Sequence, residues 1–410
     1  MHSARTDQEE LCNEKLLFLF NARHGLAPYS HAFVETMMDA QILSGFISAM
    51  LSFMQEAWGS RQSHWKTEYG SDSTLIVEVG DWIVGVLAVS RVTAELRSKV
   101  RRIVREFEDS FQFLRDADSI TGGVFDEFDG LVRREFVSER LSGRSILTKR
   151  GDWVLRTHGT KGQSVSEDVA SLLTAAKDGS TIAEIASAMN MSTTQVVEGA
   201  SRAIWQGLAG FIYLPSDKDI LSLSEGSSSV ILARNNPLGL SAETIMLLSR
   251  LDGRTDIVAL LQDVTPKKRD VVLTEVGSLL NRGYVQRESI ERIALLMSEC
   301  IVSLLLRSSA KLIGFTAARS YLTKAISRGS SAHPWIGRVT ADGDLRVRSR
   351  LDDTMSPTDT DDIRAALAFA QQDITEQIMK NLGQEKGEEI VLDAQQTCYR
   401  IWSELIDGSS

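Results

Sequence analysis

The chain has 410 residues, of which 43% are hydrophobic and 24% charged, and its formal net charge is −10. This composition is typical of a soluble protein, and at about 100–200 residues per domain the length indicates two to four domains. The negative charge excludes a chain-wide attraction to nucleic acid or to anionic membranes, although it leaves room for a local basic patch.

The three cysteines, Cys12, Cys300 and Cys398, lie far apart in the sequence. This spacing excludes a disulfide framework and a CxxC metal site, and it is typical of a reducing compartment. Residues 1–14 are polar and do not resemble a signal peptide. The longest apolar stretch, residues 33–58, is interrupted by acids, whereas a membrane span needs about 20 mostly apolar residues. We therefore expect a cytoplasmic protein without a membrane span.

Residues 1–139 are predicted to form one domain of strands and helices. Short apolar runs predict five strands, at 16–20, 29–33, 64–69, 74–79 and 82–89. Gly80-Asp81 is predicted to be a two-residue hairpin turn in which Gly80 takes a positive φ. Apolar residues at spacings of three and four predict an amphipathic helix at 93–111, and a shorter helix follows at 124–136.

A further helix is predicted at 34–58, and it is apolar around most of its circumference. Such a pattern indicates that the helix is covered on more than one side. Phe46, Met50, Phe53 and Met54 are the candidate partner-binding residues of this helix. The competing interpretation is that these side chains belong to the core, because methionine commonly fills gaps there.

The order strand, strand, long helix, three strands, helix, helix is similar to that of the longin-like domain, a relative of the roadblock family. Tyr29-Ser30, the segment at 45–49 and the segment at 75–84 carry the similarity. The resemblance implies a five-stranded antiparallel sheet with the first helix on one face and the later helices on the other. It also implies interaction rather than catalysis, since longin and roadblock domains typically bind proteins, often small GTPases.

One segment occurs twice in the middle of the chain. Leu172-Leu173 returns as Leu247-Leu248, about 74 residues later, and each copy ends in glycine and an apolar pair, at 210–212 and 283–285. Each copy is predicted to be helix, short helix, helix and strand. The predicted helices are 166–176, 182–189 and 193–207 in the first copy and 242–251, 257–262 and 267–281 in the second.

This order resembles tandem winged-helix domains, which we place at 163–216 and 217–289. Residues 140–162 are predicted to be a glycine-rich linker that contains one strand, at 153–157. Residues 219–224 and 229–233 are either the strands of the first wing or a hairpin that connects the two copies.

Winged helices bind either DNA or proteins, and charge helps to separate the two functions. The first copy has more acids than bases, and its third helix offers only Arg202. In the second copy, Lys267, Lys268 and Arg269 cluster at the start of the third helix, with Arg282 near its end. These four are the candidate nucleic-acid-binding residues, and a solvated helix start is the competing interpretation.

Residues 290–410 are predicted to be α-rich, with one β-hairpin around Asp342-Gly343. Gly314 is expected to allow close packing of helices. The acidic run at 352–362 lacks the central glycine and the final glutamate of a calcium loop, so it is interpreted as helix capping. The sequence contains no zinc-binding histidine motif, phosphate loop or dinucleotide motif, so no metal, cofactor or catalytic residue is expected.

Together these patterns predict a multidomain α+β protein with a longin-like α/β sandwich, two winged-helix domains and an α-rich C-terminal domain, 290–410. The favoured function is that of a non-catalytic scaffold or regulator with a protein partner, for which a small GTPase and a second copy of the chain are candidates. The winged helices would serve as protein-binding spacers. The alternative is a DNA-binding transcriptional regulator that uses the second winged helix, and an enzyme ranks third.

Overall fold

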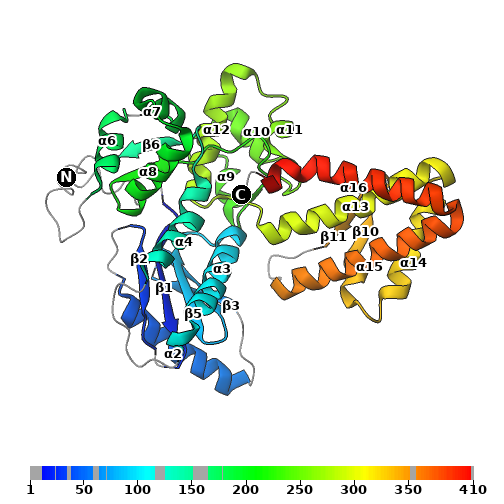
Figure 1. Cartoon of the computed structure of the whole chain (residues 1–410), viewed down its shortest axis with the longest axis horizontal. Helices are drawn as coiled ribbons and strands as arrows, with labels where there is room; N and C mark the ends of the chain where they lie inside the picture. The colour runs from blue at the N-terminus through cyan, green and yellow to red at the C-terminus, as the bar shows by residue number, and fades with distance from the viewer. Residues whose placement is uncertain are drawn as a thin grey trace. The chain divides into compact units, whose positions relative to one another are not determined.

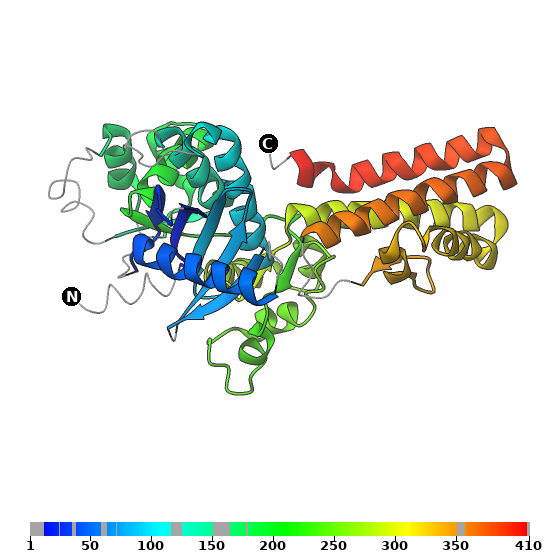
Figure 2. The same ribbon diagram turned by 90° about the horizontal axis from the view of Figure 1, so that it is seen from below.

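The computed structural model describes residues 12–23, 25–34, 38–58, 64–70, 72–115, 125–150, 165–177, 179–350 and 357–407. The chain forms two compact units, Met1–Arg287 and Glu288–Ser410, called unit 1 and unit 2 below (Figures 1 and 2). The strand predicted at 153–157 and the start of the acidic run at 352–362 lie outside the described residues.

Unit 1 begins with the predicted five-stranded antiparallel sheet, in the spatial order β2-β1-β5-β4-β3. β1 pairs with β2 and β5, and β4 pairs with β3 and β5. The inner strands β1 and β5 consist almost wholly of buried residues. The strands are β1 (Glu14–Asn21), β2 (Tyr29–Ala32), β3 (His64–Tyr69), β4 (Ser73–Val79) and β5 (Ile83–Val89).

Helices cover both faces of this sheet, because alternate residues of a strand point to opposite sides. Phe18 of β1 shares a core with Leu43 and Ile47 of α2 on one face, and Leu17 shares a core with Phe107 of α3 on the other. Each such side chain contributes about 1.5–3 kcal/mol when it is fully buried. Figure 2 shows α2, in blue, along one face of the sheet. The helices are α2 (Ala40–Trp58), α3 (Ala94–Ser110) and α4 (Asp126–Phe136).

The first helix begins later than predicted, at Ala40 instead of residue 34. The carboxylate of Asp39 accepts hydrogen bonds from the N–H groups of Gln41 and Ile42, at 2.8 and 3.1 Å. These bonds satisfy two amides that the first turn of a helix leaves without helical partners. The start of α2 is therefore set by a capping side chain, while the apolar composition continues further back.

The hairpin between β4 and β5 is present, and the N–H of Gly80 donates to the carbonyl of Ile83 at 2.8 Å. The prediction of a positive φ at Gly80 is wrong. The glycine is needed instead because a Cβ there would lie 2.5 Å from Oε1 of Glu108. That oxygen accepts hydrogen bonds from the N–H groups of Trp82 and Ile83, at 2.7 and 2.9 Å. The glycine thus lets a helix carboxylate close the hairpin.

Two copies of a small helical arrangement follow the sheet, and each contains a strand, three equivalent helices and a strand, while the second copy has the short helix α9 in addition. In each copy the strand before the first helix pairs with the strand after the third. The first copy contains β6 (Ile146–Lys149), α6 (Glu167–Ala175), α7 (Ile182–Met189), α8 (Thr193–Trp205) and β7 (Ala209–Ile212). The second contains β8 (Leu221–Leu223), α9 (Ser227–Ile231), α10 (Ala242–Leu248), α11 (Ile257–Leu260), α12 (Pro266–Asn281) and β9 (Val285–Arg287).

Equivalent backbone hydrogen bonds show that the repeat is structural. Ile182 donates to the carbonyl of Ser145 at 2.9 Å, and Ile257 donates to that of Asp219 at 3.0 Å. Each third helix ends in a glycine of positive φ, Gly207 with 67° and Gly283 with 70°, as glycine allows at such helix ends. The structural counterpart of Gly283 is therefore Gly207 and not the glycine at 210 that the sequence comparison paired with it.

Both interpretations of a wing or linking hairpin are wrong. Residues 221–223 form β8, which pairs with β9, and most of 229–233 lies in the short helix α9. The segment predicted as a linker contains β6, the leading strand of the first copy. In the described residues that follow each third helix, no further hairpin is formed. Each copy is a three-helix core whose first and last strands pair in a two-stranded sheet.

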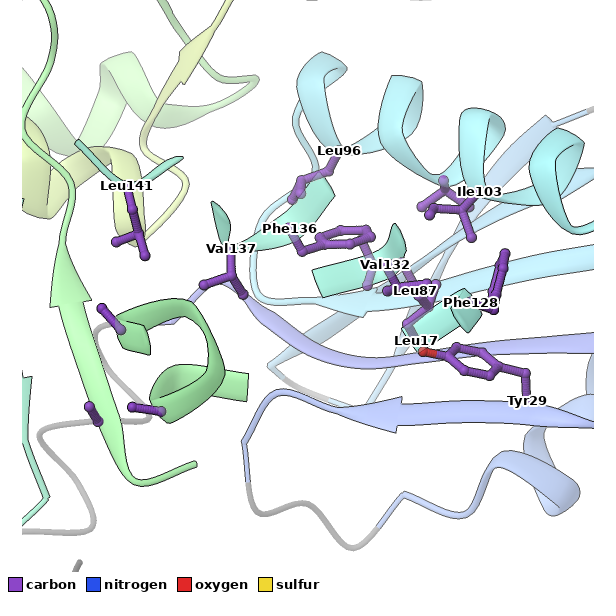
Figure 3. Packing of buried hydrophobic residues seen from close by; sticks show 14 of the residues in the cluster. Leu17, Tyr29, Leu87, Leu96, Ile103, Phe128, Val132, Phe136, Val137 and Leu141 are labelled. Carbon is purple, nitrogen blue, oxygen red and sulfur yellow. The ribbon is translucent and has the colours of Figure 1, made fainter. Parts of the chain in front are cut away.

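One edge of the five-stranded sheet is covered from within unit 1. The ring of His31 on β2 stacks on that of Trp205 in α8, with centroids 3.3 Å apart and an interplanar angle of 4°. Burial lowers the pKa of His31 to about 3, so the ring is neutral near pH 7. The core beneath continues from Leu17 through Phe136 and Leu141 (Figure 3) into the first copy. The sheet and the first copy therefore share one hydrophobic core.

Unit 2 is an α-rich bundle with one β-hairpin, as predicted. Its first helix α13 packs against α14, α15 and α16. Gly314 does not mediate close packing: it has a φ of 84°, and a Cβ there would meet nothing within 4 Å, so it serves as the turn after α13. The elements are α13 (Ile290–Ile313), α14 (Phe315–Gly329), β10 (Val339–Ala341), β11 (Val347–Ser349), α15 (Pro357–Leu382) and α16 (Gln384–Asp407).

Among the described residues, α13 is the one helix that is long and apolar enough to span a membrane by length and composition alone. Its residues Val302, Leu305 and Leu306 are buried in the core of unit 2. This burial is what a core helix of a folded bundle requires.

Two glycines in helices of unit 1 allow a matched test of how closely α12 packs against the chain at Tyr213. A Cβ at Gly277 of α12 would lie 1.8 Å from the carbonyl oxygen of Tyr213, whereas a Cβ at Gly45 of α2 would meet nothing within 4 Å. We expect G277A to lower the free energy of unfolding by about 1–3 kcal/mol and G45A to raise it by about 0.5–1 kcal/mol. Urea unfolding followed by tryptophan fluorescence measures both changes, and equal effects of the two substitutions would contradict this account.

Candidate protein-docking site

The helix α2 turns a row of apolar side chains away from the sheet. Ile42, Phe46 and Phe53 are 72%, 50% and 65% exposed. They follow one another at spacings of four and seven, which places them on one side of an α-helix. Gly45 and Ala49 lie between them and are also exposed. We call these five residues the α2 outer face.

The structure separates the four partner-binding residues predicted from sequence. Phe46 and Phe53 belong to the α2 outer face, whereas Met50 and Met54 are half-buried beside it, and Met50 packs against the core under the helix. Ile42, the most exposed apolar residue of the helix, was not among the four. Its position one turn before Phe46 was the signal that could have included it.

The α2 outer face carries little charge. Its exposed polar neighbours on the helix include Gln41, Ser52 and Glu56, and the helix has no acid in its first turn and no base in its last. Large apolar side chains exposed together on one side of a helix are typical of a surface that binds another protein. The strand β3 forms one edge of the sheet and has no strand partner on its other side among the described residues.

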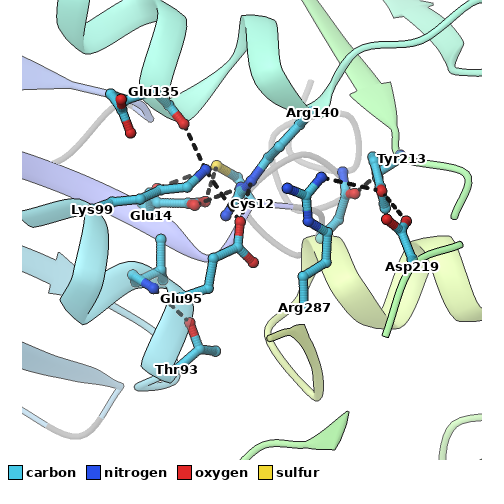
Figure 4. Close-up of polar contacts among 12 residues, drawn as sticks. Cys12, Glu14, Thr93, Glu95, Lys99, Glu135, Arg140, Tyr213, Asp219 and Arg287 are labelled. Carbon is cyan, nitrogen blue, oxygen red and sulfur yellow. Dashed lines mark hydrogen bonds and ion pairs between the residues drawn. The ribbon is translucent and has the colours of Figure 1, made fainter. Parts of the chain in front are cut away.

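A cluster of buried charges lies where the sheet meets the two copies (Figure 4). It consists of Glu14 of β1, Glu95 and Lys99 of α3, Arg140 after α4 and Arg287 of β9. Nη1 of Arg140 lies 2.6 Å from Glu14, and its Nε lies 3.6 Å from Glu95. Nζ of Lys99 lies 3.1 Å from Glu95 and donates to the carbonyl of Glu135 at 2.5 Å.

The cluster is extended into the second copy through Arg287. Its Nη1 donates to the hydroxyl of Tyr213 at 3.3 Å, and that hydroxyl donates to the carboxylate of Asp219. Tyr213 follows β7 of the first copy, and Asp219 precedes β8 of the second. The same network therefore joins the sheet, the first copy and the second copy.

The environment of this cluster shifts the pKa values of its members. Burial alone would raise the pKa of Glu95, but Lys99, Arg140 and Arg287 around it hold the pKa well below its usual range. Burial lowers the pKa of Lys99 to about 8, and Glu95 opposes that shift. Because Lys99 is 2% exposed and bonded to Glu95 and Glu135, its ammonium is not offered to a substrate. The cluster is a structural junction.

The four candidate nucleic-acid-binding residues differ in their contacts. Lys267 and Lys268 are exposed in the first turn of α12, and Lys268 pairs with Glu243. Nε of Arg269 donates to the carbonyl of Val264 at 3.1 Å. The guanidinium of Arg282 lies 5.3 Å from the centre of the Tyr284 ring, at the other end of the helix. Three of the four, Lys268, Arg269 and Arg282, thus have partners within the second copy.

No group of three or more His, Cys, Asp or Glu side chains in the described part of the chain is arranged to hold a metal ion. Comparison of the sequence with protein-family models gives no match. Comparison with curated proteins gives no match either.

Removal of the Glu95 charge tests the buried charge cluster. Because the pKa of Glu95 is depressed from 4.5 in the folded state, its stabilisation is present above about pH 4.5 and is lost as the pH falls further. We expect E95Q to lower the free energy of unfolding by about 3–5 kcal/mol at pH 7, because Lys99 and Arg140 lose a buried charged partner. The difference in the free energy of unfolding between wild type and E95Q should become smaller below about pH 4.5, as measured by denaturant titrations.

The exposed Glu106 on the same helix supplies the control for that substitution. E106Q should change the free energy of unfolding by no more than about 0.5 kcal/mol at any pH. If E95Q and E106Q behave alike, the cluster does not stabilise unit 1.

Proposed function

We propose that this chain is a non-catalytic cytoplasmic interaction protein, and that the α2 outer face of its longin-like N-terminal domain binds a protein partner. The observation that carries the proposal is the exposure of Ile42, Phe46 and Phe53 together on one side of α2. Leaving such side chains in water forgoes the stabilisation that their burial would bring. A partner surface that is itself apolar would recover it.

The resemblance to longin and roadblock domains supports a small GTPase as the partner to test first. A second copy of the chain is the other candidate, since β3 leaves one edge of the sheet without a strand partner among the described residues. Both candidates bury the same residues, so the same substitutions test them.

We further propose that the two winged-helix-like copies act as protein-binding spacers. A DNA-reading helix must be exposed to enter the major groove. The third helix of the first copy, α8, packs against α4. The third helix of the second copy, α12, is fixed to β7 through Asn281, whose Nδ2 donates to the carbonyl of Phe211 at 2.6 Å. These contacts favour a structural use of both helices.

Substitutions on α2 test the docking proposal. We expect I42D and F46D each to weaken binding to the partner at least tenfold, about 1.4 kcal/mol or more, because a buried carboxylate replaces an apolar anchor. Binding is measured by calorimetry with purified small GTPases from the same source, loaded with GDP or with a non-hydrolysable GTP analogue. Sedimentation of the chain alone measures self-association.

L392D is the matched control, because Leu392 of α16 in unit 2 is as exposed as Phe46, 55% against 50%. Its binding should equal that of wild type. Unchanged binding and unchanged self-association in folded I42D and F46D would overturn the proposal. Loss of self-association alone would assign the face to a second copy.

DNA binding by α12 is the weaker proposal, and it rests on the exposed Lys267 and Lys268 in the first turn of the helix. Fluorescence anisotropy with duplex DNA at low salt tests it. We expect no binding that depends on these residues, since Lys268 is paired with Glu243 and the chain is acidic. Saturable binding to duplex DNA that the double substitution K267A/K268A abolishes would favour the proposal that α12 binds DNA.

A further inference from the structure

Two cysteines that are distant in sequence meet inside unit 2. Cys300 lies on α13 and Cys398 on α16, and these helices pack against each other. The buried sulfur of Cys398 lies 3.6 Å from the carbonyl oxygen of Met297. Met297 lies one turn before Cys300 on α13, so the sulfur of Cys398 reaches the turn of α13 that carries Cys300. Both cysteines are free thiols.

A buried tryptophan lies beside the pair. Trp402 of α16 is 7% exposed, and its Nε1 makes no hydrogen bond in this structure. Trp402 follows Cys398 by one helical turn, on the same side of α16. An indole N–H is a donor only, and a buried donor without an acceptor is costly. A thiolate at Cys300 would supply the acceptor that this N–H lacks.

The two thiols differ in their environments. Hydrogen bonding by Cys398 lowers the pKa of Cys300 to about 7, Trp402 and Arg307 act in the same direction, and burial opposes them. The hydrogen bond with Cys300 and burial raise the pKa of Cys398. Cys300 is also the more exposed of the two. An accessible thiolate beside a protonated second thiol is the arrangement of a reactive and a resolving cysteine.

We propose that Cys300 and Cys398 form a redox-modification site, at which a hydroperoxide converts the two thiols into a disulfide that joins α13 to α16. The Cys300 thiolate attacks one peroxide oxygen, the O–O bond breaks, and Cys300 becomes a sulfenic acid while the other oxygen leaves and is protonated. The Cys398 sulfur then attacks the Cys300 sulfur and the S–O bond breaks. The hydroxyl group departs as water with the Cys398 proton, so two thiols lose two electrons to the peroxide.

Limited oxidation of the full chain tests this site. After one equivalent of hydrogen peroxide and alkylation of the remaining thiols, intact-mass spectrometry should show the loss of two hydrogens and of two alkylation sites among the three cysteines. Peptide mapping should place the disulfide between Cys300 and Cys398, and Cys12 should stay alkylated. C12S should behave as wild type. A disulfide that includes Cys12, or two thiols that stay fully alkylated, would overturn the proposal.

Single substitutions assign the roles of the two cysteines. C398S should stop at a Cys300 sulfenic acid that dimedone traps, and C300S should form no internal disulfide. In W402F, the half-maximal rate of Cys300 alkylation should move from near pH 7 to higher pH, while the circular dichroism spectrum of the fold stays unchanged. Dimedone labelling of Cys398 in C300S that equals the labelling of Cys300 in C398S would contradict these roles. So would an unshifted pH profile of Cys300 alkylation in W402F together with no trapped sulfenic acid at Cys300 in C398S.

Discussion

Unit 1 depends on the position of Arg140 between the carboxylates of Glu14 and Glu95. These groups come from the start of the sheet, from the first turn of α3 and from the segment after α4, and Arg287 adds the end of the second copy. A buried charge without a partner costs several kcal/mol, whereas a complete set of partners offsets most of that cost. The elements that supply the charges are therefore stable together and not separately.

This constraint explains which surfaces of unit 1 are covered. The first copy packs on β2 through Trp205 and shares the core that begins under α3 and α4. The second copy is held by Arg287, and Asn281 and Gly277 of α12 lie against β7 and the residue that follows it. Both copies thus lie on elements other than α2. The α2 outer face stays exposed, and for that reason it is the part of unit 1 that we propose for docking.

Local patterns in the sequence predicted the sheet, its order of elements and the repeated helices, because alternation, turn residues and helical spacing act over a few residues. The strand β6 was missed, and β8 was predicted with the wrong partner, because these strands are three or four residues long and pair with strands that lie 60 or more residues further along. The role of Gly80 depends on Glu108, which arrives from another element. The charge cluster has members from Glu14 to Arg287, and the division of α2 into half-buried methionines and exposed phenylalanines depends on which side the sheet occupies. Neither is visible without the fold.

Native-state hydrogen exchange of the full chain tests most directly whether the sheet and the two copies form one cooperative body. The account predicts that the slowest amides of β1, β5, α8 and α12 share one opening free energy, and that E95Q lowers it for all four elements by the same amount. Opening of α8 or α12 at a lower free energy than the sheet, with a response to E95Q confined to β1 and α3, would contradict it.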